Sequence, residues 1–201
     1  MISFLSPLKR LPILLAAFIL AGCYLPSQFK FDVRISDNGE YTVSYVGRLA
    51  ESTLLIGLRE GTMDAAKEAE KVEMVKKDLA RDSGFRAVNY VGGGFFDVRY
   101  EKAGNIFDDK TLTFVNGSSR ILSLALISET NTLTILGSTV PVNYHKQLKS
   151  IGFTLDGELR VVTDAKVLDH NANQISGDSE KTYFWALRDL DAPAPKIVIG
   201  G

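Results

Sequence analysis

The segment KFDVRISDNGEYTVSYVG, residues 30–47, decides how this chain begins to fold. Its first part places Phe31, Val33 and Ile35 at every second position, with charged residues between them. A period of two is typical of a β-strand that buries one face. The DNG sequence in the middle favours a hairpin turn, because Asn and Gly tolerate the positive φ angles that such turns need. The alternation then resumes, so we predict an antiparallel β-hairpin.

Strand patterns also dominate the second half of the chain. Five short apolar segments lie between turn-forming residues, a spacing typical of an antiparallel meander. Three more segments follow, and one of them carries Tyr183 and Trp185 on a single face, where we expect core residues. The expected strands are 86–91, 92–101, 110–115, 120–128, 131–137, 158–164, 181–188 and 196–199, with turns at 116–119, 129–132 and 192–195.

One amphipathic helix is predicted over residues 63–83. Apolar side chains recur there at spacings of three and four, and charged side chains lie on the opposite face. Thr62 is the expected N-cap, Asp64 suits the positive end of the helix dipole, and Gly84 is expected to end the helix in a left-handed conformation. The charged face could contact a partner or a membrane surface, but packing of the apolar stripe on a sheet explains the pattern more simply.

Two segments leave a choice open. Residues 49–61 fit either an extension of the second hairpin strand or a short helix capped by Ser52. The triple glycine 92–94 precedes a strand, whereas a phosphate-binding loop leads into a helix N-terminus. We interpret it as a bulge or kink in a strongly curved sheet, with a site of close ligand approach as the alternative.

These patterns together predict a single α+β domain over residues 29–201. Its fold class is a curved, mostly antiparallel β-sheet with one main amphipathic helix packed on it, after an N-terminal signal peptide. The chain has 201 residues, a formal net charge of −1 and one cysteine. That composition excludes an internal disulfide and a cysteine-rich zinc site, and the absence of a basic block gives no support for nucleic-acid binding.

The first 22 residues have the composition of a leader. They contain no acidic residue, and Lys9 and Arg10 precede an apolar run at 11–20. A transmembrane helix needs about 20 apolar residues, so this run is too short to span a bilayer by itself. Its length and its flanking residues are those of a signal peptide.

The end of this leader, LAGC at 20–23, resembles the lipobox of bacterial lipoproteins. The resemblance implies cleavage between Gly22 and Cys23 and attachment of a diacylglyceryl group to the thiol of Cys23. A thiol suits this reaction because the thiolate is a good nucleophile near neutral pH. We therefore expect 1–22 to be a lipoprotein signal peptide and 23–28 to be a short lipidated tether. The alternative is an uncleaved hydrophobic N-terminus with an inert cysteine.

The predicted location is the cell envelope, with the domain attached to a membrane through lipid. Several acyl chains on one residue hold a protein on a bilayer far more firmly than one chain does. Residue 24 is Tyr, whereas Asp after the lipidated cysteine retains lipoproteins at the inner membrane of enteric-type bacteria. We expect the outer membrane, facing the periplasm, if the host has two membranes.

No metal site, cofactor or catalytic group is predicted. Residues 169–180 place Asp169, Asn171, Asn173 and Glu180 at calcium-loop positions, but Gln174 replaces the glycine that such a loop needs for its sharp turn. A polar connection explains the segment equally well. The two histidines, His145 and His170, belong to no metal-binding or catalytic motif, and no nucleophile motif is present.

The order of features after Cys23 is similar to that of the LppM-like domain of bacterial lipoproteins. The similarity rests on FDVRISDNGEYTVSY (31–45), the central helix, and DAKVLDHNANQISGDSEKTYFWAL (164–187). It implies an α+β fold with a curved antiparallel sheet, a role in the cell envelope and amphipathic lipid ligands. Members often carry a C-terminal transmembrane helix, and this chain ends at KIVIGG, so Cys23 is expected to be the sole anchor.

Three hypotheses about function follow. The first is a non-enzymatic, lipid-anchored envelope protein whose curved sheet and helix form a binding or interaction module. Its ligand is unknown, and a lipid or an envelope protein is a possible partner. The second is a carrier that holds a lipid or another hydrophobic ligand in a cavity between helix and sheet, which would be lined by Phe and Leu. The third is a hydrolase with dispersed carboxylates, which would have to converge in a cleft.

Overall fold

The computed structural model describes residues 23–115 and 120–200, which form an α+β domain of two sheets and a few helices. The predicted fold class is therefore confirmed. The helices are α1 (Ser52–Arg59), α2 (Ala65–Leu79), α3 (Ile106–Asp109) and α4 (Val142–Ser150). The strands are β1 (Tyr24–Ile35), β2 (Glu40–Glu51), β3 (Phe85–Gly92), β4 (Phe95–Asn105), β5 (Thr111–Phe114), β6 (Leu122–Ile127), β7 (Thr132–Gly137), β8 (Asp156–Thr163), β9 (Val167–His170), β10 (Gln174–Ser176), β11 (Lys181–Leu187) and β12 (Lys196–Gly200).

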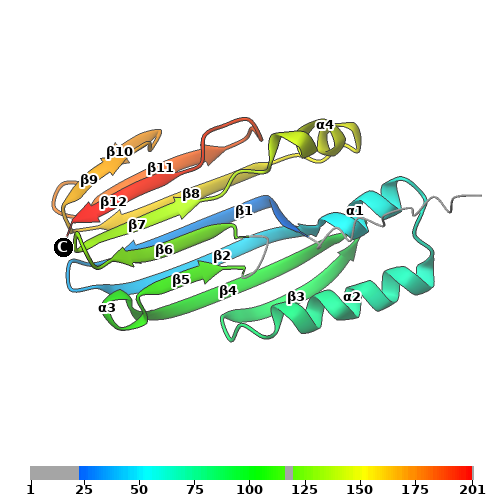
Figure 1. Ribbon diagram of the computed structural model, residues 1–201, viewed down its shortest axis with the longest axis horizontal. Helices are drawn as coiled ribbons and strands as arrows, with labels where there is room; N and C mark the ends of the chain where they lie inside the picture. Colours follow the sequence, from blue (N-terminus) through cyan, green and yellow to red (C-terminus); the bar gives the residue numbers. More distant parts are fainter. Residues whose placement is uncertain (1–22, 116–119, 201) are drawn as a thin grey trace, which may run out of the picture.

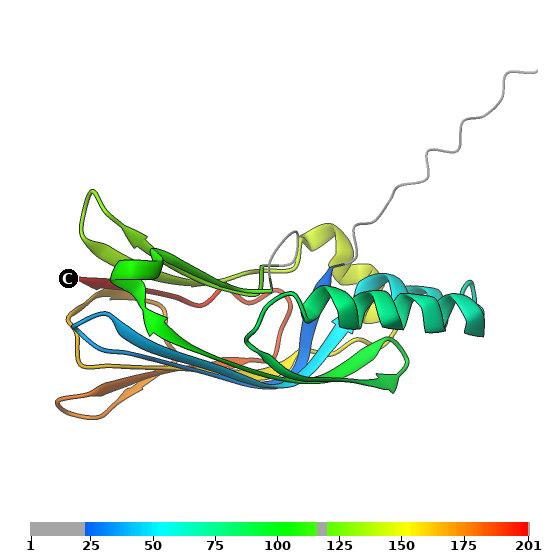
Figure 2. The same ribbon diagram turned by 90° about the horizontal axis from the view of Figure 1, so that it is seen from below.

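The strands are divided between two sheets, where the sequence suggested one continuous meander. A seven-stranded sheet has the order β10-β11-β8-β1-β2-β4-β3, and a five-stranded sheet has the order β5-β6-β7-β12-β9. Strands β1 and β8 are parallel, and the other neighbours are antiparallel. Figure 2 shows the five-stranded sheet and α2 on the same side of the seven-stranded sheet.

The chain leaves the first sheet after β4 for a local reason. Asn105 accepts a hydrogen bond from the N–H of Phe107 and so caps the short helix α3. Lys110 then adopts a φ of 62°, which redirects the chain into β5. Strand β5 pairs with β6 in the second sheet, so the meander stops at this point. The expected turn at 116–119 lies outside the described residues.

The predicted β1–β2 hairpin is confirmed (Figure 1). Ile35 pairs with Tyr41 across the turn, and Gly39 has a φ of +83°, in the left-handed region that favours glycine. The side chains of Phe31, Val33 and Ile35 are all buried, as the alternation predicted.

An aromatic cluster packs part of the space between the two sheets. The ring of Phe114, on β5, lies 4.9 Å from Phe31, 4.7 Å from Tyr45 and 4.9 Å from Tyr100, centroid to centroid. All four side chains are buried. The side chains of Tyr183 and Trp185 on β11 are buried as well, as expected for core residues.

The central helix exists, but its ends differ from the prediction. Asp64 is the N-cap of α2, since its carboxylate accepts a hydrogen bond from the N–H of Lys67 at 2.9 Å. Thr62 instead donates to the carbonyl of Gly57. The helix ends at Leu79, with Ala80 as its C-cap. Gly84 lies against the ring of Tyr100, where a Cβ would come within 2.3 Å, so close packing requires glycine there.

Three further segments are settled by the structure. Residues 49–61 are strand as far as Glu51 and then helix α1, whose N-cap is Glu51 and not Ser52. The glycines 92–94 have positive φ angles and form the hairpin turn between β3 and β4. A register shift in β3 lies next to this turn, so the expected irregularity in the sheet is there, but the glycines themselves serve the turn. Residues 24–28, expected as a tether, are the start of β1 because Tyr24 and Leu25 pack into the core.

Candidate functional site

A cavity of about 660 Å³ lies between the two sheets, at the end of the domain that carries α1 and α4. Both sheets, both helices and the segment between β11 and β12 contribute to its wall. Figure 1 shows α1 and α4 at the same end of the domain. The buried Leu and Phe side chains that line it come from β1, β6, α4, β8 and connecting segments: Leu25, Phe29, Phe31, Leu122, Leu148, Phe153, Leu159 and Leu190.

The lining matches the carrier hypothesis in chemistry but not in position. Phe and Leu side chains line the cavity, as that hypothesis required. The cavity was expected between the main helix and the sheet, yet no described residue of α2 lines it. It forms where β1 and β8 pass under the ends of β6 and β7, because α2 covers a different part of the same sheet.

A small second core holds α1 and α4 at this end of the domain. It joins Leu25 of β1 and Leu55 of α1 to Leu148 of α4, and it includes Phe153 and Leu190. Leu155 packs against both this core and the main core and also lines the cavity. The wall therefore rests on contacts between segments that are far apart in the sequence.

Polar groups at the cavity are found where it meets solvent. Arg120 and Asp189 line it and are exposed. Cys23 also lines it and is half-buried. The backbone of Cys23 is held on both sides, because its N–H donates to Oγ of Ser52 at 3.0 Å and its carbonyl accepts from the N–H of Ser52 at 2.9 Å. The residue predicted to carry the lipid thus has a fixed place at the cavity.

Helix α4 is fastened to the segment after β11 by a buried histidine. Nδ1 of His145 lies 2.6 Å from Oδ1 of Asp191, and Nε2 lies 2.7 Å from the carbonyl of Val140. Lys149 donates to the other oxygen of Asp191 at 2.7 Å. His145 and Lys149 therefore join α4 to Asp191.

We expect Asp191→Asn to loosen α4. Hydrogen bonds from Lys149 and His145 lower the pKa of Asp191 below its ordinary value of 3.8, so the carboxylate's contribution to stability is present above that value. It is lost as the pH falls through the lowered pKa. In the variant, amide hydrogen exchange of α4 should be faster at neutral pH, while exchange in β2 stays unchanged. Equal exchange of α4 in both proteins would show that Asp191 does not hold the helix.

Contacts from α2 reach the end of β2 and the start of β1, which pair beside Cys23. Glu51 is buried and accepts a hydrogen bond from the N–H of Leu54 at 2.7 Å, and its other oxygen forms an ion pair with Lys71 at 3.4 Å. The hydroxyl of Tyr24 donates to Asp78 at 2.9 Å. Burial, followed by this hydrogen bond, raises the pKa of Tyr24 well above its usual value. These contacts fix the β1 residues that adjoin Cys23.

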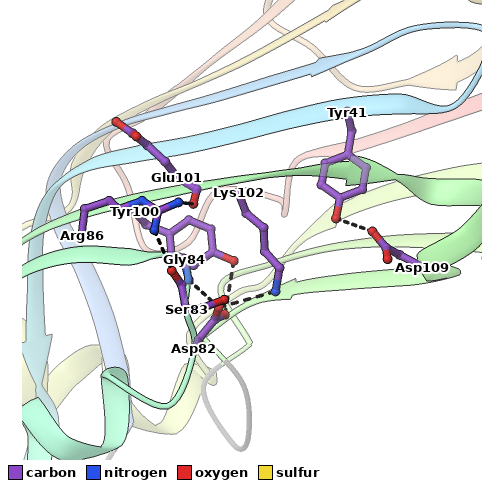
Figure 3. Close-up of polar contacts among 9 residues, drawn as sticks. All are labelled: Tyr41, Asp82, Ser83, Gly84, Arg86, Tyr100, Glu101, Lys102 and Asp109. Carbon is purple, nitrogen blue, oxygen red and sulfur yellow. Dashed lines mark hydrogen bonds and ion pairs between the residues drawn. The ribbon is translucent and has the colours of Figure 1, made fainter.

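A second polar cluster surrounds the α2–β3 connection (Figure 3). Asp82 accepts hydrogen bonds from the N–H of Gly84 at 2.9 Å and from the hydroxyl of Tyr100 at 3.2 Å. Nearby, the hydroxyl of Tyr41 donates to Asp109 at 2.7 Å. Burial, together with these carboxylates, raises the pKa of both tyrosines. The tyrosines therefore stay neutral and donate to the carboxylates.

The remaining contacts of this cluster also join neighbouring segments. Lys102 forms an ion pair with Asp82 at 3.5 Å, and Arg86 donates to the carbonyls of Ser83 and Glu101. Neither Asp82 nor Asp109 is among the residues that line the cavity. The arrangement fastens the end of α2 to β4 and gives the hydrolase hypothesis no pair of carboxylates in a cleft.

The residues of the calcium-like segment do not converge. Asp169 pairs with Lys196 at 2.7 Å, and Oδ1 of Asn171 accepts from Nε1 of Trp185 at 2.9 Å. Asn173 accepts from the N–H of Ala186, and Glu180 pairs with Arg34. Within residues 23–115 and 120–200, no group of three or more His, Cys, Asp and Glu side chains could hold a metal ion. The asparagines brace β11 and β12.

The predicted lipidation residues are only partly covered by the structure. Cys23 is described, and Gly22 and the rest of the leader lie outside the described residues. None of the described helices has both the length and the apolar character needed to cross a membrane. The cavity residues of α4 and of 188–195 were missed by the sequence reasoning, because α4 is a short, mostly polar helix and 188–195 form neither a helix nor a strand.

This chain is similar in structure to a known lipoprotein domain. No protein-family model matches the sequence, and no curated protein matches it. The folded domain of LppM from Mycobacterium tuberculosis, solved by NMR, is similar over 87% of this chain and 91% of that chain, with 12% sequence identity and a TM-score of 0.40. At this level of similarity no function is transferred, and membership of the LppM-like family stays a prediction.

Proposed function

We propose that this chain is a lipid-anchored protein of the bacterial cell envelope that binds the acyl chain of an amphipathic ligand in the cavity between its sheets. The observation that carries the proposal is the cavity itself, which measures about 660 Å³ and is lined mainly by Leu, Phe, Pro and Ile. Binding sites for small molecules have volumes of about 300–1,000 Å³ and mostly apolar walls.

The chemistry of the wall defines the class of ligand. An acyl chain transferred from water into this space gains about 0.8 kcal/mol for each buried CH₂ group. A polar headgroup would meet solvent beside the exposed Arg120 and Asp189. A ligand with an apolar chain and a polar end fits this arrangement, and such molecules are the lipids of a membrane.

The location in the proposal comes from Cys23. A lipid on this residue would attach the domain to the membrane directly, because β1 starts at Tyr24 and leaves no free linker. We propose the outer membrane, facing the periplasm, in a host with two membranes. The protein would act by binding and not by catalysis.

The interaction module, our first hypothesis from the sequence, is less well supported as the main function. That hypothesis fits a domain with a solid core between its elements. The two sheets leave a cavity of about 660 Å³ between them that opens to solvent, whereas a solid core would fill this space with side chains. The carrier hypothesis explains this volume, so we favour it.

Filling the cavity tests this proposal. We expect Leu155→Trp to lower the affinity for dansylaminoundecanoic acid by at least about tenfold, because the indole would occupy space that the chain needs. Fluorescence titration of residues 23–201 carrying Cys23→Ser, which removes the acylation site, measures this affinity. Ile175→Trp is the control, since Ile175 is 50% exposed on β10 and does not line the cavity. Equal affinities for both tryptophan variants would refute the proposed site.

A further inference from the structure

We infer that an acyl chain on Cys23 occupies the cavity of its own molecule whenever the anchor lies in neither a bilayer nor a detergent micelle. A ligand from outside then enters only when a membrane or a micelle holds the anchor. This inference rests on the proposed function, since it needs both a lipid on Cys23 and a cavity that accepts acyl chains. It adds a regulation to the same site: membrane attachment opens the cavity.

The position of Cys23 carries the inference. Cys23 is itself one of the residues that line the cavity. Its N–H and its carbonyl are both hydrogen-bonded to Ser52, at 3.0 and 2.9 Å, and β1 begins at the next residue. The sulfur therefore cannot move far from the cavity, and a chain attached to it starts at the cavity wall.

The length of the cavity suits an acyl chain. Tyr24 and Phe31 both line it, and they lie seven positions apart on β1. At about 3.3 Å per residue, with a register shift between Pro26 and Phe29, this part of β1 covers roughly 20 Å. The hydrocarbon core of a bilayer is about 30 Å thick, so one chain spans roughly 15 Å. A chain that starts at Cys23 can lie fully inside.

The tethered chain also has an advantage over a free ligand. A group attached next to its binding site competes at an effective concentration of about millimolar or higher, without any additional contact. Away from a bilayer, the apolar chain lies either in water or in the cavity. The cavity is favoured because its wall is apolar. On a bilayer the membrane competes for the chain, and the cavity becomes available to another lipid.

A photoactivatable anchor tests the inference directly. The full chain is expressed in a bacterium that acylates lipoproteins, in medium with a diazirine-containing palmitic acid. The processed protein is irradiated once in detergent-free buffer and once on phosphatidylcholine vesicles.

We expect cross-links from the Cys23 peptide to peptides that contain Leu148 or Leu159 in buffer. These cross-links should fall by about tenfold when the wild-type protein is on vesicles. They should fall by about the same factor when the Leu155→Trp variant is in buffer. Ile175→Trp should behave as the wild type does.

The possible outcomes separate the two proposals. A mixture of ¹⁴N- and ¹⁵N-labelled protein distinguishes cross-links within one molecule from cross-links between molecules. Cross-links only between molecules, only to surfaces outside the cavity, or equally strong on vesicles would overturn the inference and leave the anchor intact. Absence of label on the Cys23 peptide would overturn the proposed lipid anchor and with it this inference.

Discussion

Cys23→Ala is expected to abolish acylation and to leave the precursor uncleaved before residue 23. Alanine has no nucleophile that could form the thioether, and the lipobox resemblance makes cleavage depend on the modified cysteine. Radiolabelled fatty acid supplied to growing cells should enter the wild-type protein and not the variant. The mass of the intact variant should include the first 22 residues.

Ser52→Ala is the matched control for this experiment. It removes the Oγ that accepts a hydrogen bond from the N–H of Cys23, but it keeps the thiol. It should be acylated and cleaved as the wild type is. Fatty acid that still enters the Cys23→Ala variant would contradict the assignment of Cys23 as the lipidated residue.

Phe114→Ala should cause the largest loss of stability among single changes in the core. The Phe114 side chain is fully buried, and its ring contacts those of Phe31, Tyr45, Phe85 and Tyr100, which all lie within 5.9 Å. Since it packs β5 of the second sheet against the first sheet, its removal leaves a cavity that neither sheet can close. We expect the free energy of unfolding to fall by about 3–5 kcal/mol.

Urea unfolding followed by circular dichroism measures this change. Phe107→Ala is the control, because it deletes the same side chain at a position that is 36% exposed. Its loss should be clearly smaller. Equal losses in the two variants would show that Phe114 does not join the two sheets.

The regular parts of the fold were accessible from the sequence because their signals are local. Phe31, Val33 and Ile35 define a strand face by their spacing alone, and the stripe of α2 does the same for a helix. The helix ends were less accessible, since Thr62 and Asp64 are both good N-caps. Only the structure shows that Asp64 accepts the hydrogen bond from Lys67.

The division into two sheets and the cavity depend on long-range packing that a single sequence does not display. Leu25, Leu148 and Leu190 meet in one small core although more than a hundred residues separate the first from the others. The tether prediction failed for the same reason. YLPSQ has few strand signals, but its partner strand β2 pairs with it, and Tyr24 and Leu25 become buried.

The sequence therefore predicted the apolar chemistry of the candidate site but not its position in the fold. Lipidation of Cys23 was predicted from its local motif and stays a prediction, and an apolar cavity was expected of a carrier. Nothing in the sequence placed Cys23 on the wall of that cavity. The connection depends on Ser52, which was considered only as a possible helix cap and which in the structure hydrogen-bonds the backbone of Cys23.

Native mass spectrometry of the mature protein, extracted in detergent from the membranes of its own host, tests the central claim most directly. The micelle holds the anchor, so the cavity is free to keep its ligand. We predict a mass that exceeds the acylated polypeptide by one non-covalently bound amphipathic lipid, and we predict that Leu155→Trp loses this lipid while Ile175→Trp keeps it. A protein that carries nothing beyond its covalent anchor would contradict the account.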